Sequence, residues 1–248
     1  MEGREHEADE LRARLRQAGS EELLELLRSH LQELDAPDLR QAFRNPHLDR
    51  RGVELILAER HLLTFQEVRR ELVRHRQTPE VQALRLIPGL FWKDLVDLAG
   101  DARVRPRLRR AAERQLLQRL PGLAVGERVA IARRAGPLLL AQLRQDTEAR
   151  VIAGLLENPR LTEGALLPLV SSETARPEIL RLVARDAKWG SRYPIRLALA
   201  RNRRTPTQTS LATLPFLKKT DLKSVESDPR LPAALRRRAS TLLGNTPS

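Results

Sequence analysis

Arginine side chains are the groups through which this chain could recognise a partner. The 248 residues include 45 Lys and Arg against 32 Asp and Glu, a formal net charge of +13. Guanidinium groups hold phosphates and carboxylates through paired hydrogen bonds, so the chemistry that they suggest is binding of an anion. A solvated surface whose arginines are neutralised by nearby Glu and Asp is the alternative. The candidate contacts with phosphate or an acidic partner are Arg103, Arg105, Arg107, Arg110, Arg114, Arg201, Arg203, Arg204, Arg236 and Arg237.

Residue sets typical of catalysis or metal binding are not recognisable. The chain has no cysteine, which removes disulfides, thiolate metal sites and thiol nucleophiles. No two of its five histidines are four residues apart, so a zinc site on a helix face is not expected. Neither a glycine-rich phosphate loop nor a G-x-S-x-G elbow is present. We therefore expect no enzyme activity, no cofactor and no metal.

A few other side chains admit a functional and a structural interpretation. Trp92, Trp189 and Tyr193 could stack on a base or another ligand, or could pack between neighbouring helices. Asp94 and Asp221 stand at equivalent positions of an internal repeat. That equivalence favours a structural role, as a helix cap or as the partner of a neighbouring Arg.

The composition predicts a helical protein. Leucine and alanine supply most of the apolar residues and aromatic residues are only 3%, so strong helix formers dominate and strand formers are sparse. No stretch alternates apolar and polar residues as a strand would. The start of the chain has no apolar core of a signal peptide, and no apolar run is long enough to cross a bilayer. We expect an all-α, soluble, cytoplasmic protein without a membrane partner.

An internal repeat organises the chain. Residues 74–117 align without a gap on residues 201–244, with 16 of 44 positions identical. The alignment pairs "RHRQTP" at 74–79 with "RNRRTP" at 201–206, and Leu108 with Leu235. These two leucines recur at helical spacing among other apolar residues, so we expect equivalent core positions.

A short signature marks the ends of the predicted helices. It consists of Asn or Asp, then a small residue, Pro or Arg, and then a basic residue. Asn and Asp tolerate the left-handed αL conformation and bond to the nearby backbone, and a following Pro suits the first turn of the next helix. In the "TP" turns we expect the Thr to cap the next helix and the Pro to be its first residue. The signature occurs at Asn45-Pro46-His47, Asp101-Ala102-Arg103, Asn158-Pro159-Arg160, Asp186-Ala187-Lys188, Asn202-Arg203-Arg204 and Asp228-Pro229-Arg230.

Short helices of this kind bury their apolar stripes only by stacking on one another, as in an α-solenoid of helical hairpins. The stretch 157–239 resembles the HEAT-like helical repeats of bacterial proteins. It is also similar to the leucine-rich-repeat-variant pattern, in which R-x-A-x-A-x-N precedes a turn with "TP". The resemblance implies a helical scaffold and no particular activity, and without cysteine it carries over no iron–sulfur site. The matching residues are Arg196, Ala198, Ala200, Asn202, Thr205 and Pro206.

The expected organisation has five parts. Residues 1–40, with a net charge of −5, form an acidic helical hairpin or cap whose turn is at Gly19. The second repeat block should contain one helix more than the first, at about 176–186. The parts are 1–40, a first repeat block at 41–120, connecting helices at 121–156, a second repeat block at 157–244, and a disordered tail at 245–248.

Two functions fit this organisation. The first is a non-enzymatic scaffold of helical repeats that binds another protein, since such repeats offer an extended surface. The second is nucleic-acid binding, in which the arginines contact phosphates of DNA or RNA. The low aromatic content argues against recognition of single strands by base stacking. The sequence identifies neither the partner nor the oligomeric state.

Overall fold

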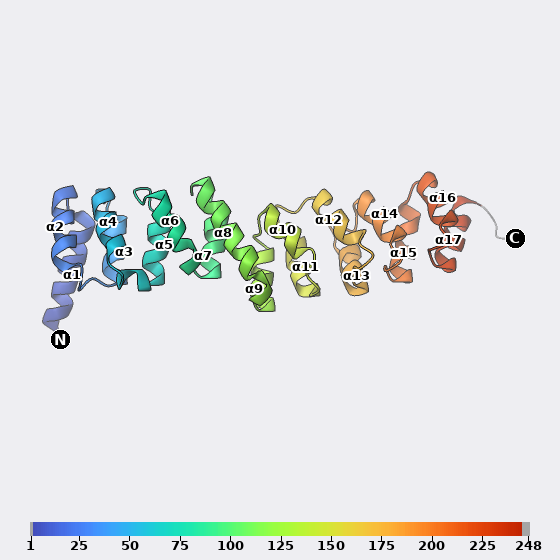
Figure 1. Ribbon diagram of the computed structural model, residues 1–248. Helices are drawn as coiled ribbons and strands as arrows, with labels where there is room; N and C mark the ends of the chain where they lie inside the picture. Colours follow the sequence, from blue (N-terminus) through green and yellow to red (C-terminus); the bar gives the residue numbers. More distant parts are fainter. Residues whose placement is uncertain (1, 245–248) are drawn as a thin grey trace. The chain divides into compact units, whose positions relative to one another are not determined.

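The computed structural model describes residues 2–244, and throughout that range the regular structure is helical (Figure 1). It contains 17 α-helices and four short 3-10 helices, with no strand among the described residues. The all-α prediction is confirmed. The tail predicted at 245–248 lies outside the described residues.

The helices belong to two compact units, which meet between Gln118 and Arg119. The boundary falls in the last turn of one long helix. The first unit holds α1 (Glu2–Gln17), α2 (Ser20–His30), α3 (Ala36–Arg44), α4 (Arg50–Ala58), η1 (Leu62–Thr64), α5 (Gln66–Arg74), α6 (Glu80–Leu86), η2 (Ile87–Gly89), α7 (Trp92–Gly100) and α8 (Pro106–Arg119).

The second unit is built from similarly short helices. They are η3 (Leu120–Gly122), α9 (Val125–Ala132), α10 (Pro137–Leu143), α11 (Ala149–Leu156), α12 (Glu163–Val170), α13 (Pro177–Arg185), α14 (Tyr193–Arg201), α15 (Thr207–Thr213), η4 (Leu214–Phe216), α16 (Lys219–Ser227) and α17 (Ala233–Leu243). The extra helix predicted near 176–186 is α13.

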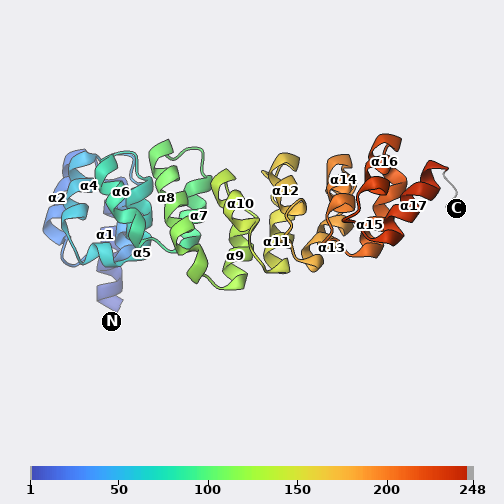
Figure 2. The same ribbon diagram turned by 45° about the vertical axis from the view of Figure 1, so that its right-hand side comes forward.

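Within each unit, a helix packs mainly on the helices one and two places away in the chain. In the first unit α1 contacts α3, α3 contacts α5, and α2 contacts α4; both views show these helices side by side (Figures 1 and 2). In the second unit α9 contacts α11, α12 contacts α14, and α15 contacts α17. Each helix therefore buries its apolar stripe against near neighbours in the chain.

The repeat seen in the sequence is reproduced in the helix boundaries. Five consecutive elements recur 127 residues later. The elements α5, α6, η2, α7 and the start of α8 correspond to α14, α15, η4, α16 and the start of α17. Leu108 and Leu235 are each 1% exposed, so the predicted pair of core positions is confirmed. The same shift of 127 residues therefore aligns both the sequences and the helices of the two copies.

The acidic N-terminal hairpin docks on the helices that follow it. Leu23 and Leu27 of α2 share one buried cluster with Leu39 of α3 and Val53 of α4. Gly19 is the N-cap residue of α2, as the predicted turn requires. The leucine face of α2 is thereby covered within the first unit.

Asparagine and aspartate do end the helices, but not in the αL conformation. Asn45, Asp186 and Asn202 are C-cap residues with extended backbone. Among the described residues only Gly244 has a positive φ. The side-chain bond to the nearby backbone is the property that is used: Asn202 Oδ1 accepts a hydrogen bond of 2.9 Å from the N–H of Arg204. Prolines after these residues lie in the turn itself and not in the next helix.

The predicted role of the "TP" turns is wrong. Pro79 and Pro206 are the N-cap residues of α6 and α15, one position earlier than expected, and no side chain caps either helix. Thr78 and Thr205 are buried, and their Oγ1 atoms have no hydrogen-bond partner among the described residues. These threonines are therefore buried residues of the turn and do not cap the next helix.

Candidate functional site

The first group of candidate arginines lies at the start of α8. Arg105 Nη2 donates a hydrogen bond of 2.9 Å to the carbonyl of Thr78, which ties this turn to the start of α6. Arg107 Nη1 lies 2.9 Å from Glu80 Oε1 in an exposed ion pair. Arg103 is exposed in the turn before α8. Arg105 and Arg107 are therefore already engaged by neighbouring groups of the protein.

Further along α8 the arginines are less engaged. Arg110 and Arg114 are both exposed, and their spacing of four residues places them on one face of the helix. No ion pair or hydrogen bond to either side chain is seen among the described residues. Both guanidinium groups are therefore open to contact with a partner.

The second group starts at the end of α14. Asn202 Nδ2 donates to the carbonyls of Val170, at 2.6 Å, and Ser172, at 2.9 Å, which ties the end of α14 to the end of α12. On either side of Asn202, Arg201 Nη2 donates to Ser224 Oγ at 2.7 Å and Arg203 Nη2 lies 3.1 Å from Glu173 Oε2. Arg204 Nε donates to the carbonyl of Glu173. The buried amide fixes the turn that carries these three arginines.

The remaining two candidates lie on α17. Arg237 is exposed, with no ion pair among the described residues. Arg236 is half-buried, and its Nε atom has no hydrogen-bond partner in the described part of the chain. Arg109, 127 residues earlier, has the same half-burial and the same unpartnered Nε. The repeat thus preserves a packed arginine at this position, which makes Arg236 a weaker candidate for contact with a partner.

The candidate residues fall into two sets, one in each unit. Arg103 to Arg114 belong to the first unit, and Arg201 to Arg237 belong to the second. The two sets are therefore two separate candidate sites.

Two adjoining hollows open beside Arg201 in the second unit. One, of about 330 Å³, is mainly apolar and is lined by Leu167, Pro194, Leu197 and Ala198. The other, of about 190 Å³, is polar and lies among the turns that follow α12, α14 and α16. Ser171, Arg201 and Asn202 line both. We call the two hollows together the Arg201 groove. The polar hollow is lined by Ser171, Glu173, Arg201, Asn202, Arg203, Asp228, Arg230 and Leu231.

Arg230 is the residue of this groove that the sequence interpretation missed. Its Nε and Nη2 donate to the two carboxylate oxygens of Asp228, at 3.0 and 2.9 Å. This bidentate pair, together with the backbone N–H of Arg230, lowers the pKa of Asp228 to about 2. The signal was present, because Arg230 is the basic residue of a helix-end signature. To include Arg230 among the candidate residues, one had to know that the turns after α12, α14 and α16 lie together.

A larger hollow of about 470 Å³ lies elsewhere in the second unit. Its walls come from the turn between α10 and α11, from the end of α12 and from the start of α13, and include Arg144 and Arg176. Arg144 Nη1 donates to the carbonyl of Ala165 at 3.4 Å, and Arg176 Nη1 lies 3.7 Å from Glu178 Oε1. None of the sequence-predicted arginines lines this hollow.

The aspartates and aromatic residues are mostly structural. Asp94 Oδ1 lies 3.8 Å from Arg70 Nη1, the kind of Arg partner predicted, and burial raises the pKa of Asp94. At the equivalent position Asp221 instead accepts a hydrogen bond from the hydroxyl of Tyr193. The partner of Asp221 is therefore a tyrosine hydroxyl, and neither of the two examples expected, an Arg or a helix cap, applies there.

Burial of Tyr193 and this hydrogen bond raise the pKa of the Tyr193 hydroxyl. Trp189 is 2% exposed, and its Nε1–H donates to the carbonyl of Leu156 at 3.1 Å. It therefore packs between helices, whereas Trp92 is partly exposed.

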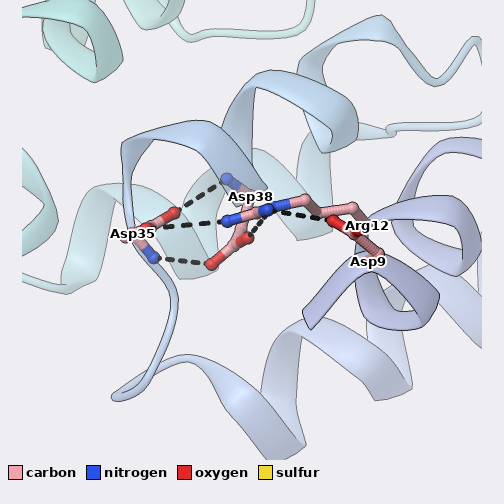
Figure 3. Close-up of polar contacts among 4 residues, drawn as sticks. All are labelled: Asp9, Arg12, Asp35 and Asp38. Carbon is pink, nitrogen blue, oxygen red and sulfur yellow. Dashed lines mark hydrogen bonds and ion pairs between the residues drawn. The ribbon is translucent and has the colours of Figure 1, made fainter. Parts of the chain in front are cut away.

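An acidic cluster at the N-terminal hairpin is also structural (Figure 3). Asp35 and Asp38 form a capping box at the start of α3, each accepting a hydrogen bond from the backbone N–H of the other. Arg12 of α1 lies 2.8 Å from Asp38 and 3.2 Å from Asp9. Burial and the proximity of Asp38 raise the pKa of Asp35. The cluster holds α1 against α3.

Two kinds of site are not found in the described range. Across residues 2–244, no helix is both long enough and apolar enough to span a bilayer. Among the side chains that the structure describes, His, Asp and Glu form no group of three that could ligate a metal ion. Among the hollows described above, the Arg201 groove is the one lined by arginines that the sequence predicted.

Comparison of the chain with protein-family models, curated proteins and solved structures gave no match in any of the three.

Proposed function

We propose that the protein is a non-enzymatic α-solenoid of HEAT-like helical repeats, located in the cytoplasm, that binds another protein through the surface of its repeats. The repeated helix boundaries, displaced by 127 residues, support the assignment of repeats. The packing of helices on their second neighbours within each unit supports their stacking. The resemblance of 157–239 to HEAT-like and leucine-rich-repeat-variant sequences is part of the same proposal.

Buried asparagines add a second line of support for stacking. Asn45 donates to the carbonyls of Leu15 and Ala18, and Asn158 donates to those of Ala132 and Ala135. Asn45, Asn158 and Asn202 each connect the end of one helix to the end of an earlier helix. Such a bond recurs because one packing arrangement recurs.

The observation that carries the binding function is the Arg201 groove. It places an apolar hollow next to a hollow lined by three arginines on one side of the second unit. Apolar contact supplies affinity and charge supplies selectivity in protein interfaces. No group suited to bond breaking is needed for this role.

The experiment that tests the proposal is recovery of partners from the native cell with the full-length protein as bait, with and without nuclease. A protein recovered in both samples at comparable yield is the expected result. Recovery that disappears after nuclease treatment would contradict it, because the link would then be nucleic acid.

Nucleic-acid binding is a second candidate, supported by Arg110 and Arg114 on the exposed face of α8. Each phosphate that is neutralised releases counterions, so affinity for a random duplex would fall steeply with salt. Arg110→Glu combined with Arg114→Glu should then weaken duplex binding at low salt, whereas Arg40→Glu, an exposed site already paired with Glu67, serves as the control. Absence of binding by the wild-type chain at low salt would exclude this candidate.

A further inference from the structure

The Arg201 groove contains more hydrogen-bond donors than the protein itself uses. Each guanidinium carries five N–H donors. Arg201 uses one for Ser224, Arg203 one for Glu173, and Arg230 two for Asp228. The other donors of these three residues have no partner among the described residues. Because Asn202 already satisfies the carbonyls at the end of α12, the free donors are not needed to cap that helix.

The charges of the polar hollow favour sparse negative groups. Arg201, Arg203 and Arg230 stand against Glu173 and Asp228, which leaves one positive charge in the lining. Asp228 stays ionised near neutral pH because its pKa is about 2. A phosphate backbone, with a charge on every nucleotide, would be repelled by the two carboxylates. A segment with separated carboxylates can place them at the guanidinium groups alone.

The apolar hollow selects what lies next to the carboxylate. Leu167, Pro194, Leu197 and Ala198 are all partly exposed, and the hollow is about 330 Å³. This lining suits one or two aliphatic side chains of a bound segment. Arg201 stands between the hollows, so an aliphatic residue and a carboxylate a short distance apart in one peptide would reach both.

We propose that the Arg201 groove is a docking site for a short acidic peptide segment in which leucine-like residues neighbour aspartate or glutamate. This inference rests on the proposed protein-binding function and names the chemistry of its partner. The three arginines call for carboxylates in the occupant, and the adjoining apolar hollow calls for aliphatic side chains. The main recognition residues are Arg201 and Arg230 for the carboxylates and Ala198 in the lining of the apolar hollow.

The test uses fluorescence anisotropy of the full chain with a synthetic labelled peptide, in which two leucines are followed by two aspartates that uncharged residues separate. One control peptide replaces the aspartates with asparagines, and another replaces the leucines with serines. The variants are Arg201→Glu, Arg230→Glu and Ala198→Glu. The matched control is Arg238→Glu, an exposed arginine of α17 in the same unit, outside the groove lining, with the same change in charge. Thermal melting of each variant checks that it is folded.

The expected result is saturable binding of the aspartate peptide to the wild type and to Arg238→Glu. Binding should weaken roughly tenfold or more in the groove variants and for both control peptides, since charge-assisted hydrogen bonds and apolar contact are lost. Three outcomes would overturn the proposal: no binding of the aspartate peptide, equal weakening in Arg238→Glu, or displacement of the peptide by a random duplex at equimolar charge.

The same variants separate the groove from the general function. If Arg201→Glu and Arg230→Glu still recover the nuclease-resistant partner of the wild type, binding by the scaffold stands and the groove proposal fails. If the wild type recovers no protein yet binds the aspartate peptide selectively, the groove stands as a peptide site and the scaffold function fails.

Discussion

Replacement of Asn158 by alanine tests how the helix ends are joined. Asn158 is fully buried, and its Nδ2 donates to the carbonyls of Ala132 at 2.7 Å and Ala135 at 3.1 Å. Its Oδ1 accepts a hydrogen bond of 2.8 Å from the N–H of Arg160. One side chain therefore holds its own turn and also the end of α9. Asn158→Ala removes all three bonds at once.

The cost follows from these three bonds. A hydrogen bond contributes about 1 kcal/mol net, and a buried group left without a partner raises that figure. We expect Asn158→Ala to lower the free energy of unfolding by about 3 kcal/mol. For a chain of this length such a change lowers the melting temperature by roughly 6–12 °C. The matched control is Asp186→Ala, whose Oδ1 accepts only from the N–H groups of Lys188 and Trp189 at a site nearer the solvent, so the expected cost is at most about 2 kcal/mol.

Asn158→Asp distinguishes the donors from the acceptor. The introduced carboxylate keeps the acceptor for Arg160 but faces two carbonyl oxygens without a proton. Burial and these carbonyls should raise its pKa above the unfolded value of about 3.9. Relative to the wild type, this variant is therefore least destabilised at low pH, where the protonated acid can donate, and the deficit grows as the pH rises through the raised pKa.

The assay is urea unfolding followed by circular dichroism at several pH values. A loss below about 1 kcal/mol in Asn158→Ala would refute the reasoning, because three bonds at a buried site cannot contribute so little. A variant Asn158→Asp as stable as the wild type near neutral pH would also refute it.

Three further predictions follow from core packing, from the Asp228 ion pair and from the N-terminal hairpin. Leu108→Ala and Leu235→Ala should each cost roughly 2–5 kcal/mol in urea unfolding, as for other buried leucines, and unchanged stability in both would show the register to be wrong. Arg230→Ala should raise the pKa of Asp228 from about 2 towards 3.8, measured by NMR of its carboxyl carbon. In the wild type the stabilisation from this pair is present above 3.8 and is lost as the pH falls through about 2; an unmoved pKa would contradict the assigned cause. Deletion of residues 1–34 should expose the apolar surface of α3 and α4 and increase binding of a hydrophobic dye, and should raise non-specific duplex affinity because an acidic segment is lost. Dye binding equal to that of the full chain would contradict the docking of the hairpin.

The sequence predicted the helices and their repeat because both depend on local spacing. Leu108 and Leu235 are found from helical periodicity alone, and the extra helix α13 from the difference in length between the blocks. The role of Trp189 between helices also follows from its type. Such features need no knowledge of distant partners.

Features that depend on distant parts of the chain were not predictable in detail. Asn202 donates to carbonyls about 30 residues earlier, and main-chain acceptors leave no mark in the sequence. The partner of Asp221 is Tyr193 because the equivalent of Arg70 is Leu197 in the second copy. The Arg201 groove forms only where the ends of three alternate helices, α12, α14 and α16, lie together, so no single segment indicates it.

The asparagine bonds have a consequence for how such a chain can change over time. Their donors are side-chain amides, but their acceptors are main-chain carbonyls, as in the contact of Asn45 with Leu15 and Ala18. Any amino acid offers the same carbonyl, so these bonds place no constraint on the side chains at the end of the earlier helix, provided that it ends at the same place. The sequence constraint between neighbouring helices therefore comes from their apolar stripes alone. If a helix pair that closes with its own asparagine is duplicated, these bonds need no matched substitution in the neighbouring pair.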